Sequence, residues 1–216
     1  MQEQELTDET NIFNKNYIPL GNERFDSQMQ FTAVIDRMTH VMRHTMLIDK
    51  SRRENDAEHS WHLAVMAQIF SEYCTHKPDV GRVIKMVTVH DLIEIYAGDT
   101  FAYDAEGNST KQEREKKAAD RLFSILPKDQ AKEIRTLWEE FDEEKTPDAM
   151  FAASLDSLQP FLHNTLTQGF TWCESKVKKS DVLKRQDIVR RTMPSVWPWV
   201  EKNIQRGIDN GWLLDE

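Results

Sequence analysis

Two histidines and two aspartates interrupt segments that are otherwise largely apolar on one side. His59 stands near the start of one such segment, His90 and Asp91 directly follow Val89, and Asp156 lies within a third. A buried carboxylate without a partner is costly, and it either finds a counter-charge or becomes neutral. We therefore expect a shared cation to hold these four side chains together.

The donor types indicate which cation this is. Imidazole nitrogen combined with carboxylate oxygen suits a divalent ion such as Mn, Co, Ni, Fe, Zn or Mg, and the pattern does not select one of them. Two carboxylates offset the charge of such an ion. An ion that prefers about six ligands would keep positions for water and substrate, which a hydrolytic centre requires.

Two further acidic residues follow the His-Asp pair. Glu94 comes four residues after His90 and three after Asp91, so on a helix it projects from the same side. A carboxyl group there could deprotonate water or protonate a leaving oxygen. Asp99 follows within the Gly98-Asp99 turn. Both are candidate catalytic residues.

Each of these signals is weak alone. A His-Asp dipeptide is common, and a single histidine near a helix start can be satisfied by a carbonyl group. Asp156 could pair with an arginine, and Glu94 could be an exposed helix residue. The interpretation depends on the joint pattern.

The joint pattern resembles the HD-domain superfamily of metal-dependent phosphohydrolases. The resemblance rests on Glu58-His59-Ser60, on the His90–Glu94 segment, on Gly98-Asp99 and on Leu155-Asp156. The surrounding sequence resembles the 5′-deoxynucleotidase branch over about residues 29–165. The segments that carry this second resemblance are Arg53-Glu54-Asn55, Leu137-Trp138-Glu139-Glu140-Phe141 and Thr146-Pro147-Asp148-Ala149.

The resemblance implies a role for each residue. His59, His90, Asp91 and Asp156 would bind the metal. Glu94 would handle the proton, and Asp99 would lie close to the sugar-phosphate and help to position the attacking water or the ribose. Arg43 would contact the substrate phosphate through its fork of donors. The branch has a tryptophan close after that arginine, whereas His44 and Thr45 stand here, so the nucleoside contacts must differ.

Other polar residues carry less information. Arg53 lies just upstream of the site and is a candidate phosphate contact, although a solvated charged loop is the simpler explanation. His62 follows His59 by three residues and is best interpreted as a packed helix histidine. His163 has no supporting spacing.

The function that follows is removal of phosphate from (deoxy)nucleoside 5′-monophosphates by metal-activated water. One alternative is a phosphodiesterase or a nucleotide-pyrophosphate hydrolase of the alarmone type, although such relatives usually add further ligands or domains. Another is a non-catalytic metal- or nucleotide-binding regulatory protein. The pattern does not identify the base or the sugar.

The elements that must position these residues are helices. Apolar residues recur with helical spacing, and strand-type alternation is absent. After a polar lead-in at residues 1–28, the signals predict a single all-α bundle of the HD-domain type over residues 29–216. The expected helices span about 29–43, 56–77, 80–96, 110–126, 128–141 and a segment that begins at Thr146-Pro147. One or two further helices are expected over about 181–210, interrupted by Pro194 and Pro198.

Composition agrees with a small helical enzyme. The chain has 216 residues, seven glycines, seven prolines and a net charge of −9. That charge argues against nucleic acid as a partner, because nucleic-acid-binding proteins carry a basic face. Two cysteines, the polar N-terminus and the lack of a long apolar run predict a cytoplasmic protein that does not contact membranes. A homodimer is implied by the resemblance alone.

Overall fold

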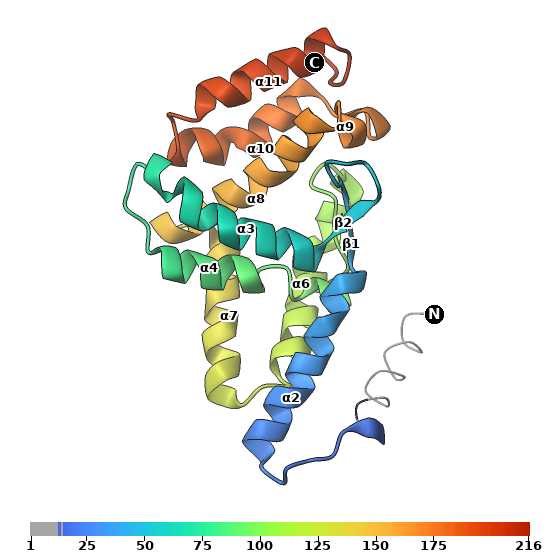
Figure 1. The fold of residues 1–216 in the computed structure, drawn as a ribbon, viewed down its shortest axis with the longest axis vertical. Coiled ribbons are helices and arrows are strands. Elements are labelled where there is room, and N and C mark those ends of the chain that lie inside the picture. Colours follow the sequence, from blue (N-terminus) through green and yellow to red (C-terminus); the bar gives the residue numbers. More distant parts are fainter. Residues whose placement is uncertain (1–12, 14) are drawn as a thin grey trace.

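The computed structural model describes residue 13 and residues 15–216, and it confirms the expected all-α fold (Figure 1). The predicted lead-in at residues 1–28 lies partly outside the described residues. The described helices are α2 (Glu23–Ile35), α3 (Asp56–Phe70), α4 (Val80–Val89), α5 (Glu94–Ala97), α6 (Ala105–Phe123), α7 (Lys128–Glu143), α8 (Pro147–Leu166), α9 (Phe170–Glu174), α10 (Lys179–Thr192) and α11 (Trp197–Asp209). Short 3-10 helices follow α2 (η1, Asp36–His40) and α3 (η2, Ser71–Tyr73).

Helix α8 is the central element of the bundle. It contacts α3, α4, α7 and α10, and most of its residues are buried. Thr146 caps its start by accepting a hydrogen bond from the Ala149 amide at 3.2 Å, and Pro147 occupies the first turn, as the sequence predicts. In Figure 1 α10 and α11 cover one end of α8, while α2, α6 and α7 extend from the other side of the bundle.

Two buried apolar clusters stabilise this arrangement. The larger joins α3, α4, α8, α10 and α11 and includes the fully buried Leu63, Phe151 and Trp172. The smaller packs α2, α5 and α6 together and includes Phe31 and Leu122. The elements that carry the histidines and aspartates are therefore fixed by packing on both sides. Within the described residues, no helix is both long and apolar enough to cross a membrane.

The bounds predicted for the first helix are wrong at both ends. Instead of spanning residues 29–43, helix α2 begins at Glu23, capped by Asn22, and ends at Ile35. The chain then forms η1 and a short antiparallel hairpin of β1 (Met42–Met46) and β2 (Arg53–Asn55). The expectation that strands are absent overlooked this hairpin, because segments of five and three residues are too short to show alternation.

The predicted helix at residues 80–96 is two helices. Residues 90–93 form tight turns, in which the Leu92 amide bonds to the Val89 carbonyl and the Glu94 amide to the Asp91 carbonyl. The ring of His90 bonds through Nδ1 to the Val87 carbonyl at 2.9 Å, the acceptor that the Asp91 amide would use in a continuous helix. The helical path therefore changes at the His-Asp pair.

Candidate active site

Helix α3, the turn between α4 and α5, and helix α8 bring the four predicted ligands together. Nε2 of His59 lies 2.9 Å from Oδ1 of Asp156, and Nε2 of His90 lies 2.9 Å from Oδ2 of Asp91. The ligand atoms of His59, His90 and Asp91 all lie within 4.8 Å of one another, and Asp156 Oδ1 is 3.9 Å from His90 Nε2. Four side chains from three segments thus face one small volume.

Local structure explains how each ligand is aimed. The start of α3 carries a capping box, in which Asn55 and Glu58 bond reciprocally to each other's backbone amides, and His59 follows in the next position. His90 is oriented by its bond to the Val87 carbonyl. Asp156 is held from behind, because Arg185 of α10 donates to its Oδ2 at 2.6 Å.

These side chains fit a divalent cation. The donors are two imidazole nitrogens and two carboxylates, and Nε2 of His90 is buried without an acceptable hydrogen bond. Burial opposes a charge on the His90 ring, but Asp91 and Asp156 outweigh it and raise the pKa of His90 to about 10. The carboxylates therefore hold a proton at a position where an ion of greater charge would bind.

Arg43 of β1 lies against the same carboxylates. Its Nη1 donates to Asp91 Oδ2 at 2.7 Å and to Asp56 Oδ1 at 2.9 Å, and its Nη2 is 4.0 Å from Asp156 Oδ1. Its side chain is almost completely buried. The hairpin that the sequence did not reveal is what places this arginine at the site.

Glu94 and Asp56 form an acidic pair beside Asp91. One oxygen from each of the three carboxyl groups lies within 4.8 Å of the others. Burial, together with the charges of Asp91 and Asp56, raises the pKa of Glu94 well above its usual value. Burial and the charge of Asp91 also raise the pKa of Asp56 to about 7. A buried carboxyl group that keeps its proton near neutral pH can act as an acid.

Asp56 was not identified from the sequence as a site residue. It is nevertheless fully buried in the first turn of α3. A signal was available, because Asp56 precedes His59 by three residues and so shares its face of the helix.

Asp99 follows the predicted turn at Gly98, at the end of α5. Gly98 ends α5 with φ 76° and ψ 148°, a conformation that side chains with a Cβ rarely adopt. Asp99 lines the pocket with Asp91, Glu94 and Asp156. Burial raises the pKa of Asp99, although the charge of Arg43 opposes the shift.

The pocket also contains residues that sequence spacing could not identify. Lys111 of α6 and Arg185 of α10 line it together with Arg43, so positively charged groups come from three elements. Phe101 and Tyr103 line it from the loop before α6, and the ring of His44 stacks on Phe101 with centroids 4.6 Å apart. Arg185 lies on a different helix from Asp156, and nothing in the spacing of the two predicts their contact.

The structure places Arg53 away from this pocket. Both of its close contacts are with protein groups, since it bonds to the His44 carbonyl and to the Glu174 carboxylate at 2.7 and 2.9 Å. Among the described residues that line the pocket, Arg53 does not appear. Its contacts fasten β2 to β1 and α9.

Comparison with known proteins shows what the chain is similar to. A model of a family described as HD domain matches residues 35–197. The human protein named 5′-deoxynucleotidase HDDC2 is 28% identical over 137 residues, which cover 63% of this chain and 66% of that protein, slightly less than two thirds of its length. The Schizosaccharomyces pombe protein named 5′-deoxynucleotidase hdd1 is 24% identical over 169 residues, 75% of this chain and 74% of that protein.

A solved structure resembles the whole bundle. It is described as a predicted metal-dependent phosphohydrolase from Magnetospirillum magnetotacticum MS-1. The two chains are 42% identical with a TM-score of 0.86, and the similarity covers 92% of this chain and 100% of that one. The likeness therefore extends over most of the chain.

Proposed function

Because the chain belongs to the HD domain family, we propose that it is a metal-dependent phosphohydrolase that removes phosphate from nucleoside 5′-monophosphates, deoxy forms above all. The observation that carries the proposal is the convergence of His59, His90, Asp91 and Asp156 on one volume, with the buried Nε2 of His90 facing both carboxylates. The names of the similar proteins support the reaction and the substrate class.

In this proposal the four side chains hold one divalent ion. When bound, such an ion would polarise a phosphoryl oxygen and lower the pKa of water. His59 and His90 contribute neutral nitrogens, while Asp91 and Asp156 contribute the negative charge. Arg185 keeps Asp156 oriented through its bond to Oδ2.

The phosphate would bind among the positive groups of the pocket. Arg43 and Arg185 offer planar forks of N–H donors that match phosphate oxygens, and Lys111 adds a third positive charge. A phosphate monoester carries nearly two negative charges at neutral pH, so several cations are needed to bind it in a chain with a net charge of −9.

Glu94 is the proton donor in this scheme. When water attacks phosphorus and the bond to the 5′ oxygen breaks, the departing oxygen needs a proton. The raised pKa of Glu94, caused by burial and by Asp91, keeps a proton available near neutral pH. Asp99 lines the same pocket, where its carboxylate would orient the water or the sugar.

Aromatic side chains would hold the nucleoside. The stacked pair of His44 and Phe101, with Tyr103 edge-on to Phe101 at 5.2 Å, offers ring surfaces next to the cations. Every nucleobase has a flat π face, so stacking on such ring surfaces does not depend on which base is bound. In this proposal the aromatic group serves where the 5′-deoxynucleotidase branch has a tryptophan.

A mechanism that uses two ions is less well supported than one that uses a single ion. The acidic group Asp56, Asp91 and Glu94 could bind a second cation that shares Asp91. However, Arg43 Nη1 already lies 2.9 Å from Asp56 and 2.7 Å from Asp91, so a positive charge is present there. This contact favours a single ion over the multi-ion centres of phosphodiesterases.

A phosphate-release screen tests the proposal. Purified protein would be assayed with each ribo- and deoxyribonucleoside 5′-monophosphate in the presence of Mn, Co, Ni, Mg or Zn. Bis(4-nitrophenyl) phosphate and guanosine tetraphosphate would report phosphodiesterase activity and pyrophosphate release. We expect inorganic phosphate from monophosphates and a preference for deoxy forms. Turnover of the diester alone, or of none of these compounds, would refute the assignment.

A homodimeric assembly and a cytoplasmic location are part of the same proposal. Both come from the resemblance to the family and from the sequence rather than from contacts within the chain. Light scattering during size-exclusion chromatography should give twice the chain mass of 25.4 kDa.

A further inference from the structure

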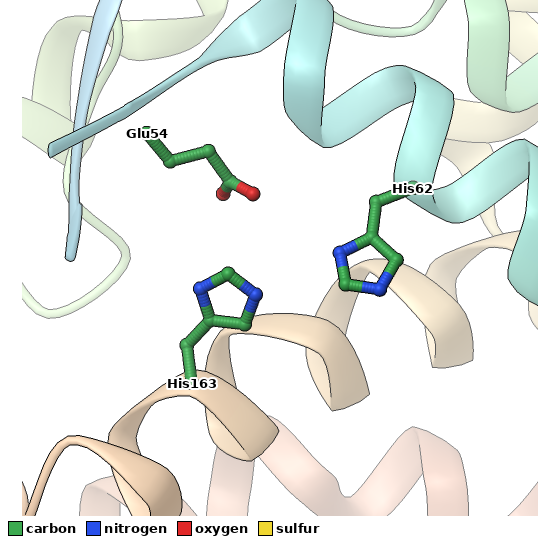
Figure 2. Close-up of side chains that lie close together, drawn as sticks. All are labelled: Glu54, His62 and His163. Atoms are coloured by element: carbon green, nitrogen blue, oxygen red, sulfur yellow. The ribbon is translucent and has the colours of Figure 1, made fainter. Parts of the chain in front are cut away.

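A second cluster of metal-ligand type lies beside the four predicted ligands. Glu54 of β2, His62 of α3 and His163 of α8 point toward one another, and one ligand atom from each lies within 4.8 Å of the others (Figure 2). Glu54 and His163 are buried, whereas His62 is half-buried. Two imidazoles and a carboxylate are also what zinc prefers.

The amide nitrogen of Gln159 occupies the centre of this cluster. Its Nε2 lies 2.6 Å from Glu54 Oε1, 3.2 Å from His62 Nδ1 and 3.1 Å from His163 Nε2. An ion bound equally by the three groups would need the same position. Because the amide nitrogen carries only hydrogens toward its neighbours, it is a donor that repels a cation. The cluster therefore binds the amide rather than an ion.

The histidine tautomer supports this interpretation. Nδ1 of His163 lies 3.0 Å from the Met46 carbonyl, which can only accept, so Nδ1 carries the hydrogen. Nε2 of His163 consequently presents its lone pair to the Gln159 amide. Glu54 offers a carboxylate oxygen. Glu54, His62 and His163 thus form a socket of acceptors, and the socket fixes the orientation of the Gln159 amide with its nitrogen toward them.

The other end of the amide reaches a predicted metal ligand. Oε1 of Gln159, which is fully buried, lies 3.1 Å from Nδ1 of His59. A second acceptor, Glu54 Oε2, lies 3.6 Å from the same nitrogen. Both neighbours are acceptors, so Nδ1 of His59 must carry a hydrogen, and Nε2 is the nitrogen left to bind an ion beside Asp91 and Asp156.

We propose that Gln159 is a positioning residue that holds His59 in the tautomer needed to bind the ion, and that Glu54, His62 and His163 form the socket that fixes its amide. His90 has the equivalent bond to a backbone carbonyl, so only His59 depends on a side chain that mutation can change. Partners of this kind typically change metal affinity by about 10–100-fold. The inference rests on the proposed function only in placing an ion at His59.

Two substitutions separate positioning from simple packing. Gln159→Leu keeps the approximate shape but removes the acceptor for His59, so we expect about 10–100-fold weaker binding of Co²⁺ or Zn²⁺. Gln159→Glu keeps an acceptor for Nδ1 of His59, so we expect metal affinity at least equal to that of the wild type. The Glu variant should nevertheless unfold more easily than the Leu variant, because it places a carboxylate against Glu54. If Gln159 were purely structural, the variant with the lower stability would also have the lower metal affinity.

The measurement is calorimetric titration of chelator-stripped full-length protein with Co²⁺ or Zn²⁺, with thermal unfolding of each variant in parallel. Thr165→Val is the matched control, since Thr165 is buried on the same helix and donates to the Leu162 carbonyl at 2.7 Å without contacting His59 or lining the pocket. It should lower stability and leave the metal affinity unchanged. His62→Phe, at the half-buried side of the socket, should weaken binding in the same direction as Gln159→Leu but less.

Two results would overturn the inference. The first is unchanged metal affinity in both Gln159→Leu and His62→Phe. The second is binding of two ions per chain by the wild type with loss of one in His62→Phe, which would make the socket an ion site. Neither result depends on turnover, so a failure of the proposed reaction, seen as an absence of phosphate release, remains distinguishable.

Discussion

At the scale of single residues, the two predicted histidine ligands are oriented by the same kind of hydrogen bond. Each donates from Nδ1 to a fixed acceptor, the Val87 carbonyl for His90 and the Gln159 side chain for His59. Each therefore turns Nε2 toward the carboxylates of Asp91 and Asp156. Imidazole orientation is set before any ion arrives, which reduces the reorganisation that binding requires.

Glu94→Gln should separate catalysis from metal binding. The amide cannot donate an acidic proton, so we expect kcat for phosphate release to fall by about 10²–10⁴-fold while metal content stays at the wild-type level. Steady-state assays and elemental analysis of the same preparation check both parts. Glu113→Gln, on the exposed side of α6, should match the wild type. Loss of the ion in the Glu94 variant would instead make Glu94 a ligand.

Metal affinity should rise with pH. Asp91 and Asp156 outweigh the effect of burial and raise the pKa of His90 to about 10, so the metal-free protein holds a proton there at pH 7. The ion needs the neutral ring and must displace that proton. The association constant should therefore increase by about tenfold per pH unit for each proton released.

Titration of stripped protein between pH 6 and 9 measures this slope. The exposed His40 serves as a control, because His40→Ala should leave the slope unchanged. An association constant that is flat or that falls with increasing pH would show that the ion does not replace a proton.

At the scale of elements, sequence patterns located the long helices but not all of their ends, since α6 begins at Ala105 rather than about 110 and α3 ends at Phe70 rather than about 77. Helices α7 and α8 begin where the proline and capping signals predict, because those signals act within one turn. The patterns failed around β1, where apolar residues such as Met38 and Val41 continue the helical spacing of α2 although the chain has already left the helix. They also missed the turn at His90, since a tertiary site rather than local propensity interrupts α4.

Gly98→Ala tests whether the end of α5 positions Asp99. An alanine at φ 76° and ψ 148° is strained by about 2 kcal/mol, although its Cβ would meet no atom within 4 Å. We expect the backbone to relax, Asp99 to shift, and kcat to fall at least about tenfold.

The matched control is Gly211→Ala, which also has a positive φ and open space around the added Cβ but lies after α11. It should lose comparable stability and keep full activity, as measured by thermal unfolding and phosphate release. Equal kcat values for the two variants would show that Asp99 does not depend on this turn.

At the scale of the whole molecule, the site combines segments that are far apart in the chain. The convergence of His59, His90, Asp91 and Asp156 could be anticipated, because each interrupts a largely apolar segment and a family resemblance linked them. The roles of Arg185 and Gln159 could not be anticipated. Arg185 of α10 contacts Asp156 of α8, and Gln159 is bound by the cluster that contains Glu54. Such contacts depend on packing, which composition and spacing do not encode locally.

The ion should also stabilise the entire bundle, since it ties α3, α8 and the turn after α4 together. Binding at about one hundred times the dissociation constant contributes about 2.7 kcal/mol. For a chain of this size that is about 5–10 °C in Tm. Scanning calorimetry with and without EDTA should show this difference in the wild type and none in Asp91→Ala. An equal response to EDTA in both proteins would mean that the ion binds elsewhere.

The most direct test of the account is a metal titration of activity. Protein stripped by a chelator would be assayed for phosphate release from deoxynucleoside 5′-monophosphates while Co²⁺ or Mn²⁺ is added in fractions of an equivalent. The account predicts no activity before addition, a linear rise, and a break at one ion per chain, with no rise in Asp91→Ala. Full activity in the stripped protein, or restored activity in Asp91→Ala, would contradict it.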